Sequence, residues 1–192
     1  MTHHELLNRF PLATERLLLR VVSPDDAEAI VRYYTENKDY LAPWEPVRSE
    51  EFYAISFWKT MLQEARQEFL HGKSMRLVFC LKSSAPTPIV GVMNFNNIIR
   101  GVFQACYLGY SIGYRYQGQG LMHEALQRAL TFAFEELCLH RVMANYMPRN
   151  ERSGRLLRKL GFVPEGYARN YLKIAGKWED HILTAFVTPQ ES

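Results

Sequence analysis

The sequence of 192 residues predicts an α/β (α+β) fold, in which a mixed sheet of about seven strands is flanked by about four helices. Strand and helix patterns alternate only in the second half of the chain, which is typical of a mixed sheet rather than a parallel one. The length corresponds to a single domain over residues 1–192. A chain of this size buries ~70% of its unfolded surface without disulfide or metal support.

In the first half, a Leu- and Val-rich strand is predicted over 16–22. Ser23-Pro24-Asp25-Asp26 then opens a helix, with an N-cap serine, an early proline and acidic residues in the first turn. Two prolines exclude a regular helix over 41–46, and helical spacing of apolar residues predicts a second helix from Ser49 to Gly72. Three strands follow, at 75–82, 88–99 and about 106–112, with a Ser/Pro turn between the first two.

The second half begins with a strong helix predicted over 121–138, where Ala and Leu form one face. A strand is expected over 141–147. Asn150 caps a short helix that ends at Gly161. Two final strands, 162–174 and 178–187, form a hairpin.

Composition excludes several classes of protein. With 47% hydrophobic and 22% charged residues, the chain is neither disordered, collagenous nor a coiled coil. The net charge of +3 is mild and spread along the chain, and we find no direct nucleic-acid motif. No stretch approaches the roughly 18 apolar residues of a membrane span, and Met1–Phe10 lacks the features of a signal peptide.

The cysteines suggest a reducing compartment. Cys80, Cys106 and Cys138 are odd in number and widely spaced, which argues against a disulfide framework. No residues are spaced as metal ligands, so no metal is expected. These features together predict a cytoplasmic protein.

One glycine-rich segment indicates a binding site for an anion. A strand ending near Gly113 is followed by Gln117-Gly118-Gln119-Gly120 and then by a predicted helix starting at Leu121-Met122. Glycines allow close approach to the backbone, and the amides of a helix N-terminus attract an anion such as a phosphate or pyrophosphate. A P-loop is absent, and His123 stands where a dinucleotide fingerprint needs its third glycine.

This loop resembles the acyl-CoA loop of the GNAT acetyltransferases, whose pattern is Q/R-x-x-G-x-G/A. Gln117–Met122 fits it with Met122 at the last position. A register shifted to Arg115 also fits but would start the helix two residues early, so we favour the first. Arg16–Arg20 resembles the first strand of the same family. Further segments resemble the branch that acetylates protein N termini: Asn150–Ser153, Leu156-Leu157, Leu160–Phe162 and Glu165-Gly166.

The resemblance implies the GNAT fold, with a mostly antiparallel sheet, and acetyl-CoA as co-substrate. It implies that Ser111, Ile112 and Gly113 line the pantetheine arm, that Asn150 reaches the arm from the other side, and that the loop binds the pyrophosphate. The loop residues are Gln117, Gly118, Gln119, Gly120, Leu121 and Met122. Taken by its position alone, Asn150 is better explained as a helix N-cap.

The resemblance also implies catalytic roles. The common general acid of the family is a tyrosine at the position of Leu157, which cannot donate a proton. The N-terminal branch implies Ser153 in that role, with Glu165 as the base that accepts the amine's proton. Trp44 and Glu45 lie in a Pro-bounded loop that can bind substrate, with Glu45 attracting an ammonium group.

The implied substrate is the N-terminal alanine of a ribosomal protein, number five of the small subunit. The small ribosomal subunit as a whole is a possible second partner. The sequence does not determine the oligomeric state. Two alternatives remain. One is an acetyltransferase for polyamines or other small amines. The other is a non-catalytic factor that acts in ribosomal subunit assembly.

Overall fold

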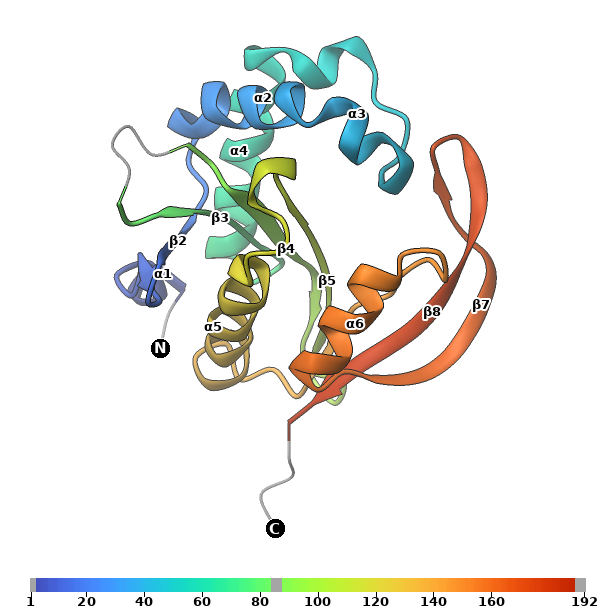
Figure 1. Cartoon of the computed structure of the whole chain (residues 1–192). Coiled ribbons are helices and arrows are strands. Elements are labelled where there is room, and N and C mark those ends of the chain that lie inside the picture. The colour runs from blue at the N-terminus through green and yellow to red at the C-terminus, as the bar shows by residue number, and fades with distance from the viewer. Residues whose placement is uncertain (1–2, 84–87, 189–192) are drawn as a thin grey trace.

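The structure, a computed structural model, describes residues 3–83 and 88–188 (Figure 1). The α-helices of this part of the chain are α1 (His3–Leu7), α2 (Ala27–Glu36), α3 (Lys38–Leu41), α4 (Ile55–Leu70), α5 (Leu121–Glu135) and α6 (Glu151–Leu160). The strands are β1 (Leu12–Ala13), β2 (Leu17–Val21), β3 (Met75–Leu81), β4 (Gly91–Ile99), β5 (Ala105–Ile112), β6 (Arg141–Met143), β7 (Val163–Ile174) and β8 (Lys177–Val187).

These strands form one mixed sheet in the order β1-β2-β3-β4-β5-β6-β8-β7. Neighbouring strands are antiparallel except for β5 and β6, which are parallel. The predicted α/β class with a mixed, mostly antiparallel sheet is therefore confirmed. Its eight strands exceed the predicted number by β1, and α1 and α3 are additional helices. These elements are two to five residues long, too short to leave a period in the sequence.

The start of α4 differs from the prediction. The helix begins at Ile55 rather than Ser49, after a separate 3₁₀ turn over Glu50–Tyr53. Ala54 between them has extended backbone (φ −88°, ψ 135°), which interrupts the helical hydrogen bonding. The apolar spacing that predicted one continuous helix continues through the 3₁₀ turn, because Phe52 is also buried.

β4 and β6 are each shorter than predicted by at least three residues. β4 begins at Gly91, and β6 ends at Met143, beyond which Tyr146 makes an isolated bridge to Ile182. The Ser/Pro turn predicted before β4 falls largely on residues 84–87, which lie outside the described residues.

Helices cover both faces of the sheet (Figure 1). On one face, α5 and α6 enclose a core that contains Phe79 and Phe132. On the other face, α2 and α4 enclose a second core that contains Tyr34 and Trp58. Side chains alternate across a strand, so consecutive residues of β3 pack into different cores. Val78 belongs to the second core and Phe79 to the first.

β5 and β6 stay side by side over only three positions, Ala105–Tyr107 against Arg141–Met143. β5 continues along β4 as far as Ile112, while the chain after β6 follows β8. Beyond Tyr107, one edge of β5 therefore has no neighbouring strand within the described residues. The peptide groups of such an edge are free to pair with a ligand that enters between the diverging strands.

Candidate functional site

The glycine loop before α5 presents open backbone. Gly118 and Gly120 have φ angles of 70° and 75°, in the left-handed region that favours glycine. A Cβ added at Gly118 would meet no atom within 4 Å. α5 begins at Leu121 with Gly120 as its N-cap, the boundary that the favoured register requires. The first amides of α5, those of Leu121 and Met122 included, have no acceptor within the helix and can bind an anion.

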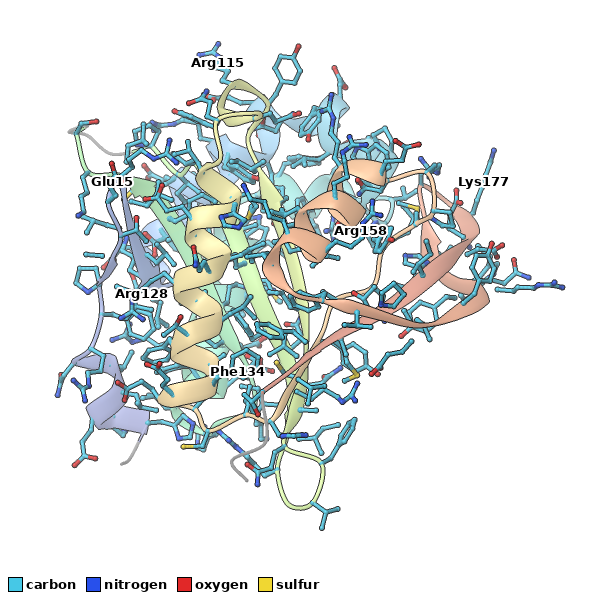
Figure 2. The ribbon with its side chains drawn as sticks, turned by 60° about the horizontal axis from the view of Figure 1, so that its bottom comes forward. Glu15, Arg115, Arg128, Phe134, Arg158 and Lys177 are labelled. Atoms are coloured by element: carbon cyan, nitrogen blue, oxygen red, sulfur yellow. The ribbon has the colours of Figure 1, made fainter. Side chains whose placement is uncertain are left out.

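Arg152 of α6 reaches across to this loop. Its Nη1 donates a hydrogen bond of 2.5 Å to Oε1 of Gln117, and Tyr40 of α3 lies beside both side chains. Figure 2 shows α5 and α6 on the same side of the sheet, with Arg115 at the tip of the loop pointing away from the protein. Arg152 was not predicted as a site residue, because its partner lies 35 residues earlier in the chain.

Ser153 forms a hydroxyl pair with Tyr110. Its Oγ lies 2.7 Å from the Tyr110 hydroxyl, and burial raises the pKa of Tyr110 to about 12. Asn150 acts as the N-cap of α6, since its Oδ1 accepts a hydrogen bond of 3.2 Å from the Ser153 amide. Leu157, at the position of the family's tyrosine, is buried in the core. The site therefore contains a tyrosine hydroxyl, supplied by β5 instead of α6.

The C-terminal end of β5 is fixed by α2. The hydroxyls of Tyr33 and Ser111 are 2.9 Å apart, and burial raises the pKa of Tyr33. Asn37 donates to the Tyr33 carbonyl (2.8 Å) and accepts from the Tyr114 amide (2.8 Å). Gly113 follows β5 directly, and its amide donates to Val90 (2.9 Å). Ser111, Ile112 and Gly113 thus stand on a strand end that is held rigidly.

Trp44 and Glu45 lie on the turn that follows α3. Oε2 of Glu45 accepts hydrogen bonds from Nε and Nη2 of Arg48, at 3.2 and 3.0 Å. Burial raises the pKa of Glu45, and the positive charge of Arg48 opposes this shift. The Glu45 carboxyl also acts electrostatically on Tyr33, whose hydroxyl meets Ser111. Glu45 is therefore a partly buried carboxylate near the end of β5.

Glu165 lies apart from these groups. Its two carboxylate oxygens are 2.8 and 2.7 Å from Nη1 of Arg141. Val142 faces the core beneath α5, so the neighbouring Arg141 points to the opposite face of the sheet. Tyr110 and Ser153 are on the α5 side. The structure therefore does not bring Glu165 together with Ser153.

The described residues contain no group of three or more His, Cys, Asp or Glu side chains that could hold a metal ion. Within the same residues, Cys80, Cys106 and Cys138 form no disulfide with one another. Among the helices of residues 3–83 and 88–188, none is long and apolar enough to cross a membrane.

Comparison with known proteins gives consistent matches. The acetyltransferase (GNAT) domain family matches residues 16–163. The [ribosomal protein uS5]-alanine N-acetyltransferase of Escherichia coli is 48% identical over 178 residues, which cover 93% of this chain and 91% of that enzyme.

Two solved structures are also similar. The ribosomal-protein-S5-alanine acetyltransferase of Vibrio fischeri superposes with a TM-score of 0.88 at 38% identity, over 94% of this chain and 97% of that one. Mycobacterium smegmatis RimJ, solved in complex with CoA-disulfide, gives a TM-score of 0.83 at 30% identity, over 91% of this chain and 84% of that one.

Proposed function

We propose, because this chain belongs to the GNAT acetyltransferase family, that it transfers the acetyl group of acetyl-CoA to the N-terminal alanine of ribosomal protein uS5. The observation that carries this substrate is the 48% identity, across nearly the whole length of both chains, to the Escherichia coli enzyme named for that reaction. RimJ bound to CoA-disulfide supports a coenzyme A thioester as the donor.

The proposed cofactor site has two parts. The glycine loop, Gln117–Met122, would hold the pyrophosphate with its backbone amides. The free edge of β5, from Ser111 to Gly113, would pair with the pantetheine arm, and Asn150 would approach the arm from α6. The open backbone at Gly118 and the divergence of β5 from β6 support this placement.

In the proposed reaction, the neutral amine attacks the thioester carbonyl, the C–N bond forms and the C–S bond breaks. Ser153 is the proposed donor of a proton to the thiolate. Glu165, on the opposite face of the sheet, is the proposed base, which would accept the amine's proton through water. Trp44 and Glu45 are proposed to receive the ammonium end of the acceptor. An α-amine has a pKa of about 7.7–8.0, against about 10.4 for lysine, so a modest base suits an α-amine better.

The experiment is an acetylation assay with three acceptors: a peptide that begins with alanine, the same peptide N-blocked with an internal lysine, and spermidine. We expect acetyl-CoA-dependent transfer to the alanine peptide and much slower transfer to the other two. Preference for spermidine would support a small-amine enzyme instead. In cells without the gene, mass spectrometry of ribosomal proteins should find uS5 unacetylated. Binding to small ribosomal subunits without any transfer would support the assembly-factor alternative.

A further inference from the structure

Two segments that are far apart in sequence meet beside the proposed acceptor residues. The first is the 42–48 loop, which follows α3 and carries Trp44 and Glu45. The second is the β7–β8 hairpin, which curves toward α3 (Figure 1). The Ala175 amide, at the hairpin's tip, donates a hydrogen bond of 2.9 Å to the Glu45 carbonyl. Figure 2 shows Lys177 at the same tip.

Arg149 joins both segments. Its guanidinium carbon lies 5.1 Å from the centre of the Trp44 ring, over its face. Its Nη2 donates to the Pro43 carbonyl (3.2 Å) and to Oε1 of Glu179 on β8 (3.0 Å). One side chain therefore contacts the 42–48 loop at two places and the hairpin at one.

The geometry points to Arg149 as a positioning residue for acceptor recognition. We propose that it fastens the 42–48 loop to the β7–β8 hairpin, so that Trp44 and Glu45 are ordered before the acceptor arrives. This inference rests on the proposed function, in which these two residues receive a protein N terminus. A pre-ordered binding loop improves affinity because less conformational entropy is lost when the acceptor binds.

An arginine suits this task better than a lysine. The planar guanidinium can lie over the Trp44 ring while its N–H groups donate to a carbonyl and a carboxylate. A lysine ammonium is a point charge that can keep the ion pair with Glu179 but not all three contacts. Arg149→Lys should therefore retain part of the effect.

Kinetics with the alanine peptide provide the first test. We expect Arg149→Ala to raise the KM for the peptide about ten-fold, the scale of losing one charged hydrogen bond and one cation–π contact. kcat at saturating peptide and the Kd for acetyl-CoA should stay within about two-fold. Arg149→Lys should fall between Arg149→Ala and wild type. An unchanged KM, or an equal loss in Arg149→Lys and Arg149→Ala, would overturn the proposal.

Hydrogen exchange tests the same link without using activity. Arg149→Ala should speed exchange in the 42–48 loop and at Ala175, while α5 keeps its protection. The control is Arg9→Ala, which removes a surface ion pair of similar exposure: the side chains of Arg9 and Glu136 are 53% and 27% exposed, and those of Arg149 and Glu179 are 45% and 26%. Unchanged exchange in the loop contradicts the proposal. If wild-type protein leaves the alanine peptide unmodified, the proposed function fails, and the exchange result still decides whether Arg149 orders the loop.

Discussion

The hydroxyl oxygens of Tyr110 and Ser153 lie 2.7 Å apart, which joins β5 to the first turn of α6 across 43 residues of sequence. Because burial raises the pKa of Tyr110 to about 12, its phenol stays protonated over the working range of pH. The phenol can therefore donate to Ser153 Oγ and leave the serine proton directed elsewhere. This arrangement supplies a hydroxyl pair where Leu157 cannot donate.

Removing either hydroxyl tests the role of this pair. We expect Ser153→Ala to lower kcat by about 10²-fold or somewhat less, the low end for acid–base groups, because a thiolate leaves readily. Tyr110→Phe should lower kcat less, since the serine proton remains. Calorimetry should give the wild-type Kd for acetyl-CoA in both variants. Tyr167→Phe, which removes an exposed hydroxyl bonded to Asp180 at 2.6 Å, is the matched control. A wild-type kcat in both site variants would show that water, and not this hydroxyl pair, protonates the thiolate.

The proposed role of Glu165 as a base can be tested separately from its ion pair with Arg141. Glu165→Gln should lower kcat/KM about 10²-fold below the pKa of the α-amine and less above it, because more amine then arrives neutral. Arg141→Gln removes the partner at 2.7 Å but leaves the carboxylate, so activity should stay within about three-fold. A pH profile from about 6.5 to 9 measures both. Equal losses in the two variants, at every pH, would assign Glu165 to the sheet edge and not to catalysis.

We expect the positive charge of Arg152 to contribute to the affinity for acetyl-CoA. It lies beside the glycine loop that is proposed to bind the pyrophosphate, through its hydrogen bond to Gln117. Arg152→Ala should weaken acetyl-CoA binding about ten-fold at low salt and less at high salt, because a charge–phosphate attraction is screened. Acetyl-pantetheine, which lacks the phosphates, should bind both proteins alike. Arg155→Ala, which removes an exposed ion pair with Glu151, is the control. A loss that is equal for both ligands would place Arg152 at the arm rather than at the phosphates.

The raised pKa of Glu45 predicts that the stability of the protein depends on pH. Burial raises the pKa of this carboxyl above its ordinary 4.5, with Arg48 opposing the shift. The folded protein therefore holds this proton at pH values where the unfolded chain has lost it, and the carboxyl's contribution to stability falls as pH rises from about 4.5 through the folded pKa. Urea unfolding at about pH 4 and about pH 7 should show Glu45→Gln gaining stability relative to wild type at the higher pH. A difference that does not vary with pH would contradict this.

The close packing around Gly91, on the strand that pairs with β5, predicts that a larger residue there destabilises the fold. A Cβ here would lie 2.3 Å from the buried Phe79 ring and 2.6 Å from the Ser111 carbonyl oxygen. Gly91→Ala should therefore destabilise the fold by about 1–3 kcal/mol or more. At Gly166, a Cβ would meet only Leu183 at 3.7 Å, so Gly166→Ala should change stability by less than about 1 kcal/mol. Thermal and urea unfolding compare the two, and equal effects would refute the packing argument.

Much of the fold follows from local patterns. The helix that begins at Leu121, the hairpin of β7 and β8, and the alternation of β5 were all predicted, because period and capping depend on residues within a few positions. The break at Ala54 was missed, since the apolar spacing continues through it. The short elements α1, α3 and β1 left no periodic signal, because they form only where the rest of the chain supports them.

The sequence by itself determined the family and the glycine loop at Gly118 and Gly120, because each is a pattern of residue types at fixed spacing. The absence of a hydroxyl at Leu157, where the resemblance implies a tyrosine, can also be read from the sequence. Only the tertiary structure decided that Tyr110 meets Ser153, that Arg152 reaches Gln117, and that Glu165 pairs with Arg141. These pairs are separated by 43, 35 and 24 residues. Alternation along a strand assigns a side chain to a face of the sheet, but its partner depends on which strands and helices pack together there.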